Sequence, residues 1–483
     1  MSFIGSLDQG TTSTRFIVFN ELGQIVGQNQ LEHQQILPQA GWVEHDATEI
    51  WQNTQKVIAS ALIDAKIKIN DLSAIGITNQ RETVVAWNRT TGAPIANAIV
   101  WQDTRTADYL NNFTDQNKRL ITQKTGTPIA PYFSASKMAW LLAHKISDRS
   151  NLAFGTIDSW ITFKLTGEFV TDVTNASRTQ LMNLETLDWD DELLSIFGIE
   201  RAWLPTIKSS SEIYGSTGDG IPVAGILGDQ QAAMVGQTCF NKGESKTTYG
   251  TGNFALTSTG TELVRSKNGL ITTVLFKLGD APVQYALEGS VAVTGSAIQW
   301  LRDQLGIITS ASEVEALAQS VPDNGGVYFV PAFSGLFAPY WRSDARGVIV
   351  GLTRANTKAH IARAALEAIC YQTKEVIDAM EADSSIKLTE MRVDGGITKN
   401  NLCMQMQSDI MGIDIVKPVI TETTALGAAF AAGLAVGIWK NTAQITEIWR
   451  KEKTWHCQSN AESRAKGYAN WRKAITRTFD WIE

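Results

Sequence analysis

Cysteine and histidine are scarce in this chain of 483 residues, which has four of the former and five of the latter. Cys239, Cys370, Cys403 and Cys457 form no CxxC pair. This spacing favours free, buried thiols in a reducing compartment over a disulfide framework. None of the histidines begins an HExxH motif, so a zinc enzyme has little support.

Basic tracts and long apolar runs are also missing. The formal net charge is −7, with acidic and basic residues interspersed, whereas binding to a nucleic-acid backbone requires a basic surface. No apolar run reaches the roughly 20 residues of a membrane-spanning helix, and the first residues lead directly into a strand-like segment. We therefore expect a cytoplasmic protein with no nucleic-acid partner and no membrane span.

Two common phosphate-handling motifs are absent as well. The dipeptide Gly-Lys does not occur, which excludes a P-loop of the form GxxxxGK followed by Ser or Thr. No His-Arg-Asp triplet occurs, which excludes the catalytic loop of protein kinases. Chemistry on a nucleoside triphosphate therefore requires another scaffold.

The composition that remains is that of a globular protein, with 43% hydrophobic and 19% charged residues. A chain of 483 residues exceeds what one hydrophobic core usually supports, so we expect roughly two domains. We place the boundary within residues 236–242. This gives an N-terminal domain of residues 1–237 and a C-terminal domain of residues 238–483, which ends in a helical tail from Ile445.

The two halves open with similar patterns. Residues 3–7 and 14–19 read as strands around a Gly/Thr turn, and residues 247–249 and 254–257 repeat this arrangement. Helical spacing over residues 49–66, behind Asp46 as N-cap, and later over residues 297–304 and 361–380 adds the helices. The chain is therefore predicted to be α/β, with a weak internal duplication.

The first turn, Asp8-Gln9-Gly10-Thr11-Thr12-Ser13, presents backbone N–H groups and hydroxyls to a point where an anion can sit. Arg15 adds a positive charge. A carboxylate belongs beside phosphate only with a divalent cation between them, which predicts a Mg²⁺ role for Asp8, through water. An ordinary hairpin turn remains the alternative.

The second turn lies within Gly250-Thr251-Gly252-Asn253-Phe254-Ala255, which formally matches the dinucleotide fingerprint GxGxxG/A. That fingerprint needs a following helix, but Phe254 begins a strand-like run, so the pattern favours a second phosphate-facing hairpin over a dehydrogenase. Further on, Asp394-Gly395-Gly396 ends a strand with small residues. These residues leave room for a flat ring such as adenine.

Two other strand ends carry polar side chains. Asp229 and Gln230 follow an apolar run, and a carboxylate there suits the proton acceptor that phosphoryl transfer to an alcohol needs. The alternative is an aspartate that caps the following helix. The guanidinium group of Arg81 offers N–H donors and the carboxylate of Glu82 offers acceptor oxygens, a combination that suits adjacent hydroxyls of a polyol. Their alternative is a surface ion pair.

Ten segments together resemble the FGGY carbohydrate kinases over nearly the whole chain. They are LDQGTTS at 7–13, GWVEHD at 41–46, GITNQRET at 76–83, AIVWQ at 98–102, TNASRT at 174–179, GDQQAA at 228–233, TYGTG at 248–252, YALEG at 285–289, RVDGG at 392–396 and TALGAA at 424–429. The match is close to the members of this family that phosphorylate glycerol.

This resemblance implies two actin-like (ribonuclease H-like) ATPase domains that flank a central cleft, with ATP, Mg²⁺ and glycerol in the cleft and sn-glycerol 3-phosphate and ADP as products. It also implies the roles of individual residues. The glycerol hydroxyls would be held by Arg81, Glu82, Tyr132, Asp229 and Gln230, with Asp229 as the general base, and the carbon chain would lie against Trp101 and Phe254. Asp8 would help to hold Mg²⁺. The phosphates would be faced by Thr11, Thr12, Ser13, Arg15 and Thr251, and the rest of the nucleotide would be lined by Gly295, Gln299, Gly396 and Asn400.

The sequence lacks two features through which some members of the family are regulated, a Gly/Arg-rich loop that binds fructose 1,6-bisphosphate and a phosphorylated histidine. Residues 218–222 form a short segment without arginine, which argues against control by fructose 1,6-bisphosphate there. No histidine lies between His144 and His360, which argues against activation by histidine phosphorylation. The resemblance further implies a homodimer or homotetramer.

Two alternatives stay open. A sibling kinase would act on a pentulose or tetritol, although the aromatic wall of Trp101 favours a three-carbon alcohol. An actin- or Hsp70-like ATPase would hydrolyse ATP without a polyol, and would leave Arg81 and Asp229 without a role.

Overall fold

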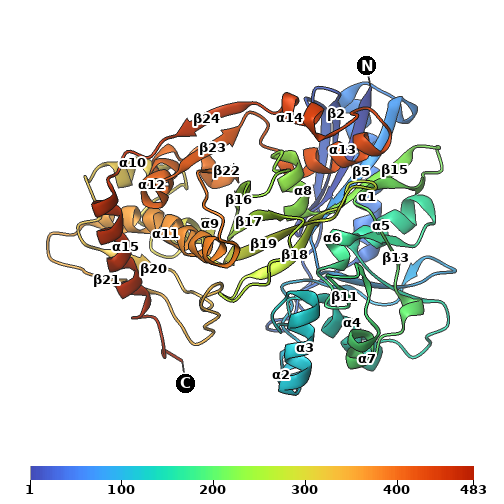
Figure 1. The fold of residues 1–483 in the computed structure, drawn as a ribbon, viewed down its shortest axis with the longest axis horizontal. Helices are drawn as coiled ribbons and strands as arrows, with labels where there is room; N and C mark the ends of the chain where they lie inside the picture. The colour runs from blue at the N-terminus through green and yellow to red at the C-terminus, as the bar shows by residue number, and fades with distance from the viewer. Residues whose placement is uncertain (1, 483) are drawn as a thin grey trace.

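The computed structural model describes residues 2–482, which form two large β-sheets surrounded by helices (Figure 1). The expectation of a mixed α/β fold is confirmed. The first sheet has the strand order β14 (Ser211–Ser216), β15 (Pro222–Gly228), β5 (Leu72–Asn79), β1 (Phe3–Gln9), β2 (Ser13–Asn20) and β3 (Ile25–Glu32). The second has the order β18 (Ile271–Phe276), β19 (Gln284–Val291), β17 (Asn253–Gly260), β16 (Ser245–Tyr249), β22 (Glu390–Gly395), β23 (Asp414–Pro418) and β24 (Lys451–Trp455).

The two sheets share one plan. Strand β1 runs antiparallel to β2 and parallel to β5, which is parallel to β15. In the same way, β16 runs antiparallel to β17 and parallel to β22, which is parallel to β23. The predicted duplication is confirmed, and in each half the parallel strands end at one edge of their sheet, where binding residues are commonly found.

Smaller sheets complete the fold. A five-stranded sheet joins β4 (Glu44–His45), β8 (Ala98–Ile99), β6 (Val84–Asn88) and β7 (Ala93–Pro94), with β9 (Leu152–Thr156) paired to β6. Three strand pairs are β10 (Val170–Asp172) with β13 (Thr206–Lys208), β11 (Met182–Asn183) with β12 (Asp188–Trp189), and β20 (Tyr328–Val330) with β21 (Val348–Val350).

The helices begin and end where local signals indicate. The first, α1 (Ala47–Ala65), follows Asp46, whose side chain accepts the N–H of Thr48 as the predicted N-cap. Its apolar face packs on β2 and β3. The others are α2 (Ala107–Asn111), α3 (Asp115–Thr125), α4 (Ser134–His144), α5 (Ile157–Thr166), α6 (Val173–Ala176), α7 (Asp191–Phe197), α8 (Asp229–Gly236), α9 (Gly295–Asp303), α10 (Glu313–Gln319), α11 (Lys358–Ser384), α12 (Asn401–Met411), α13 (Thr423–Ala435), α14 (Thr442–Ile448) and α15 (Ala461–Ile475).

Helices α8 and α13 join the two halves. Although α13 comes late in the chain, it packs on β1, β5 and β15 of the first sheet, where Figure 1 shows it beside the blue strands. A Cβ atom on Gly427 would lie 1.8 Å from the carbonyl oxygen of Ala232, and one on Gly236 would lie 1.9 Å from that of Thr423. The backbones of α8 and α13 therefore touch, which only glycine permits at these two positions.

The domain boundary between residues 237 and 238 stays a prediction.

The end of the chain departs from the helical expectation. Helices α14 and α15 are present, but the helical assignment is wrong for Lys451–Trp455, which forms the edge strand β24 beside β23.

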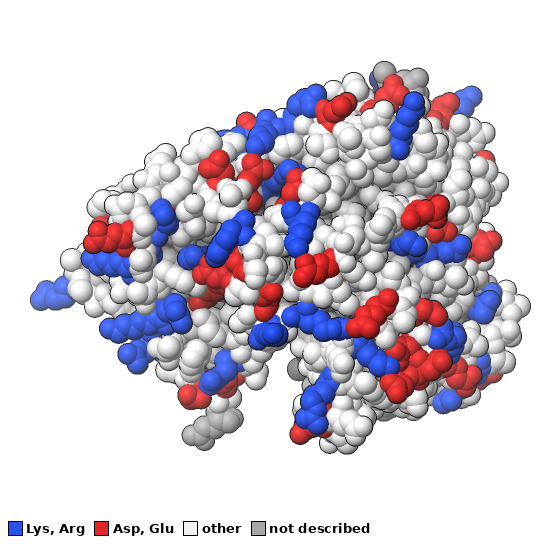
Figure 2. Space-filling view, viewed as in Figure 1, with Lys and Arg blue, Asp and Glu red and all other residues white. Residues whose placement is uncertain are grey.

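Within residues 2–482, no helix has the length and apolar character needed to cross a membrane. Figure 2 shows acidic and basic side chains interspersed on one face, and a notch at its lower edge between the two halves.

Candidate active site

The turn after β1 brings a carboxylate and several hydroxyls to the edge of the first sheet. Asp8 is the second-last residue of β1, and the N–H of Gly10 donates to the carbonyl oxygen of Ser13 at 3.0 Å, which closes the turn. Burial raises the pKa of Asp8 to about 7, a trend that Arg15 opposes and Asp229 reinforces. Asp8 and Asp229 are therefore close enough to interact, although 221 residues separate them.

Arg15 lies opposite Asp8 in the hairpin. Its guanidinium group donates to Glu422 at 2.5 Å and to Gln28 at 2.9 Å. Glu422 is the N-cap residue of α13, so Arg15 also ties the first turn to the helix that joins the halves. Its contact with phosphate stays a prediction.

The ends of β5 and β15 place Arg81 beside Asp229. The two strands are parallel neighbours, and the Nε atom of Arg81 lies 3.1 Å from Oδ1 of Asp229. The same Oδ1 accepts the backbone N–H of Gln230 at 2.7 Å. Arg81 is 3% exposed and Glu82 is 1% exposed, so the surface ion pair considered for them is wrong. Glu82 also has a φ of 62°, an unusual backbone conformation for glutamate.

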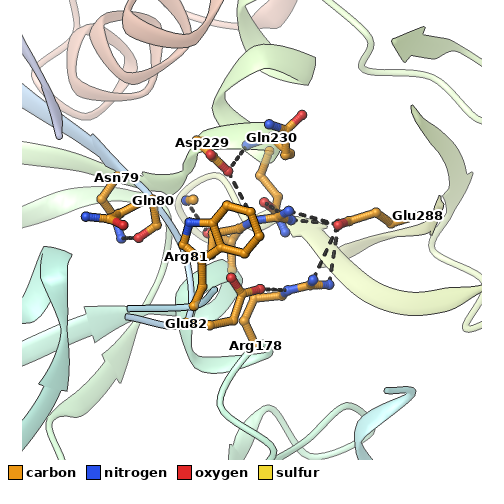
Figure 3. Close-up of polar contacts among 12 residues, drawn as sticks. Asn79, Gln80, Arg81, Glu82, Arg178, Asp229, Gln230 and Glu288 are labelled. Carbon is orange, nitrogen blue, oxygen red and sulfur yellow. Dashed lines mark hydrogen bonds and ion pairs between the residues drawn. The ribbon is translucent and has the colours of Figure 1, made fainter. Parts of the chain in front are cut away.

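Glu288 of β19 is the central partner of this cluster, and sequence reasoning gave it no role (Figure 3). Its carboxylate accepts hydrogen bonds from Nη1 and Nη2 of Arg81 at 2.6 and 2.8 Å. Arg178 donates to the same carboxylate at 3.3 and 3.4 Å, and its Nε donates to Glu82 at 2.6 Å. A chain of buried ion pairs therefore connects the two halves.

Electrostatics explains why these buried charges are tolerated. Burial alone would raise the pKa of Glu288, but Arg178 and Arg81 outweigh it and hold the pKa at about 2. For Glu82, burial prevails over Arg178 and raises the pKa. The site therefore combines one firmly ionised carboxylate with one that is more readily protonated.

The sequence held a weak signal for Glu288 and Arg178. Both lie in segments that resemble the FGGY kinases, YALEG and TNASRT. Their roles depend on pairing across 207 residues, between Arg81 and Glu288, and across 110 residues, between Arg178 and Glu288. Neither separation follows from local spacing, because the pairs form only where the two sheets meet.

Two of the aromatic residues predicted to bind substrate lie together. The rings of Trp101 and Tyr132 have centroids 5.3 Å apart in an edge-to-face arrangement. The indole Nε1 of Trp101 donates to the hydroxyl of Thr11 at 3.0 Å, which connects this pair to the first turn. Phe254 lies separately on β17, opposite Thr248.

The residues predicted for the nucleotide gather on the second half. The N–H of Gly295, at the start of α9, donates to the carbonyl oxygen of Gly250 in the second turn at 3.1 Å. Gly396 opens the short 3₁₀ helix η3 (Gly396–Lys399), and Asn400 caps α12 by accepting the N–H of Cys403 at 2.9 Å. Gln299 is exposed on α9. Gly295 therefore contacts the second turn, while Gly396 and Asn400 lie at the N-termini of η3 and α12.

Comparison with known proteins identifies the family. The model for the N-terminal domain of the FGGY family of carbohydrate kinases matches residues 3–236, and that for the C-terminal domain matches residues 246–436. The chain belongs to the FGGY family of carbohydrate kinases. As an FGGY kinase, it has the expected two-domain, actin-like fold, and the kinase activity predicted from the sequence agrees with this membership.

This FGGY kinase is similar along its whole length to proteins that carry a more specific name. It is 59% identical over 501 residues to a glycerol kinase of Mycolicibacterium vanbaalenii, with 100% of this chain and 99% of that protein covered. The crystal structure of Plasmodium falciparum glycerol kinase with ADP matches with a TM-score of 0.94 at 41% identity, covering 99% and 98% of the two chains. A xylulose kinase from Lactobacillus acidophilus shares the fold, with a TM-score of 0.86 at 23% identity over 99% and 97% of the chains.

Proposed function

We propose that this FGGY kinase transfers the γ-phosphoryl group of ATP to glycerol, giving sn-glycerol 3-phosphate and ADP. The observation that carries the proposal is the 3.1 Å contact between Arg81 and Asp229, in a chain 59% identical over its whole length to a named glycerol kinase. An arginine and a carboxylate at adjacent strand ends provide a hydroxyl-binding donor beside a proton acceptor.

Asp229 is the proposed general base. Its Oδ1 atom is engaged by Arg81 and by the N–H of Gln230, whereas Oδ2 accepts no hydrogen bond from residues 2–482. We assign Oδ2 to take the proton from the attacking hydroxyl. As that O–H bond breaks, the hydroxyl oxygen bonds to the γ-phosphorus, the bond to the β-phosphate oxygen breaks, and ADP leaves.

Arg81 has one donor left for the substrate. A guanidinium group has five N–H donors. The two on Nη1 donate to Gln231 and Glu288, one on Nη2 donates to Glu288, and Nε lies in an ion pair with Asp229. The remaining N–H, on Nη2, is proposed to bind a glycerol hydroxyl. Glu82, Tyr132 and Gln230 would bind the other hydroxyl groups, with Trp101 and Phe254 against the carbon chain.

Asp8 is the proposed contact to Mg²⁺. Its carboxylate oxygens suit this hard cation, and within residues 2–482 Asp8 has no ion-pair partner within 4.0 Å. Burial raises its pKa to about 7, which indicates that a nearby cation would stabilise the charged form. When bound, Mg²⁺ would supply charge neutralisation at the phosphates. Within the described residues no cluster of three or more metal-ligating side chains occurs, so phosphate oxygens and water would complete the shell.

The two Gly/Thr turns are the proposed phosphate contacts. They occupy equivalent places in the duplicated sheets, and each offers backbone N–H groups and hydroxyls. We assign Thr11, Thr12, Ser13 and Arg15 of the first and Thr251 of the second to the phosphates. Gly295, Gln299, Gly396 and Asn400 are assigned to the rest of the nucleotide.

Release of ADP with and without glycerol tests the function. We expect glycerol to raise the rate at least tenfold, and xylulose, ribulose and erythritol to be poorer acceptors. A faster rate with a ketopentose would favour the sibling kinase, and ADP release independent of any acceptor would favour an ATPase.

The oligomeric state, homodimer or homotetramer, stays a prediction that sedimentation velocity would test.

A further inference from the structure

A buried lysine lies behind the proposed substrate site. Lys246 of β16 is 0% exposed, and its Nζ atom donates to Oε1 of Gln230 and to the hydroxyl of Thr248, the latter at 2.9 Å. Burial lowers the pKa of Lys246 to about 8, while Asp394 and Asp229 counteract that shift. The side chain is therefore mostly an ammonium ion at neutral pH.

The contact between Lys246 and Gln230 determines which way the Gln230 amide points. An ammonium group has three donors and no acceptor, so the amide atom that faces it must be oxygen. The Nε2 atom of Gln230 then points away from Lys246. It donates to none of residues 2–482, and Figure 3 shows it on the side of Asp229.

We propose that Lys246 is a positioning residue for phosphoryl transfer, which holds the amide of Gln230 so that its Nε2 group, and not its Oε1, faces the polyol and one N–H can donate to a polyol oxygen. Lys246 belongs to the second half of the molecule and Gln230 to α8 of the first half. The contact therefore also makes the orientation of a substrate-binding side chain depend on how the two halves meet.

The arrangement affects substrate selection. An amide turned by 180° would present a carbonyl oxygen, which accepts hydrogen bonds but cannot donate one. With Lys246 in place, the polyol must supply a lone pair at this position while Glu82 and Asp229 accept its protons. The site then discriminates against analogues that lack this oxygen, because a donor would be left unpaired.

Lys246→Met tests the proposal, which rests on the proposed function, because it keeps the chain length and removes the donors. We expect KM for glycerol to rise at least tenfold and KM for ATP to change less than twofold. Lys242→Met is the control, since Lys242 lies four residues earlier, is half exposed and pairs with the exposed Glu262. Equal changes in both KM values, or an unchanged KM for glycerol, would overturn the proposal.

A double-mutant comparison shows whether Lys246 acts through Gln230. If it does, Lys246→Met combined with Gln230→Ala has the glycerol KM of Gln230→Ala alone, whereas an independent role makes the two effects multiply. Should Lys246→Met not fold, Gln230→Glu remains informative. Its carboxylate pairs with Lys246 but offers the polyol no donor, so we expect a KM for glycerol at least tenfold higher, and an unchanged value overturns the proposal.

Failure of this inference can be distinguished from failure of the proposed function. If the parent enzyme does not phosphorylate glycerol, the proposed function is wrong. If the parent is active and the glycerol KM of Lys246→Met equals that of the parent, the role of Lys246 is wrong while the reaction stands. An unchanged glycerol KM in Gln230→Glu would in addition remove Gln230 from the proposed substrate contacts.

Discussion

Arg81 and Glu288, which are 207 residues apart in the sequence, join through two parallel hydrogen bonds of 2.6 and 2.8 Å. Arg81 follows a strand of the first sheet and Glu288 lies in a strand of the second. Both side chains are buried, so the pair is shielded from solvent and salt. The arginine proposed to bind substrate is thus held from the opposite half.

Removing the charge of Glu288 should destabilise the fold. Glu288→Gln keeps the shape but leaves Arg81 and Arg178 without their shared counter-charge, and breaking a buried pair costs about 3–5 kcal/mol. Urea denaturation measures this loss. The control is Glu262→Gln, which breaks the exposed pair with Lys242 and should cost less than about 1 kcal/mol. Equal losses in both variants would show that Glu288 has no special role.

The two functions of Trp101 can be separated by two substitutions. Trp101→Phe keeps an aromatic wall and loses the hydrogen bond to Thr11, so KM for glycerol should change about fivefold or less, since a net hydrogen bond contributes about 1 kcal/mol. Trp101→Ala removes the wall and should raise KM for glycerol at least tenfold while improving the relative rate with four-carbon and five-carbon polyols. A substrate panel measures both effects. Unchanged selectivity in Trp101→Ala would contradict the proposed wall.

The stability of the protein should fall in acid because of His45. This residue is buried against Gln35, Gln80 and His33, and burial, reinforced by His33, lowers its pKa from 6.5 to about 3. The unfolded chain therefore binds a proton between these values that the folded chain does not. The free energy of unfolding should decrease as pH drops below 6.5, by up to roughly 1.4 kcal/mol per pH unit.

His45→Gln should remove that contribution to the slope while leaving other titrating groups in place. Urea denaturation between pH 4 and 7 measures it, and His144→Gln serves as a control because His144 is exposed. If His45→Gln and the parent lose stability in parallel over this range, His45 is not the group responsible.

Local sequence predicted the elements that local physics determines. The two hairpins, the Asp46 cap of α1 and the strand ends that carry Arg81 and Asp229 are confirmed. Strand β24 was missed because its sequence, KEKTW, has one buried residue, Trp455, and gains its conformation by pairing with β23 at the sheet edge.

The part of the site that escaped prediction depends on contacts between the halves. Lys246, Arg178 and Glu288 have roles only because the two sheets meet, and α13 reaches the first sheet only after more than 400 residues. Long-range pairing of buried charges leaves no periodic pattern in the sequence. The resemblance to the FGGY kinases indicated the segments but not these partners.

The turnover of Asp229→Asn, measured together with its affinity for glycerol, tests the central claim most directly. The amide keeps the shape of the aspartate but cannot accept the hydroxyl proton, so the account predicts that kcat falls by roughly 10²–10⁴-fold while glycerol still binds with a Kd within about tenfold of that of the parent, the range of a single lost interaction. A kcat close to that of the parent would contradict the assignment of Asp229 as the general base.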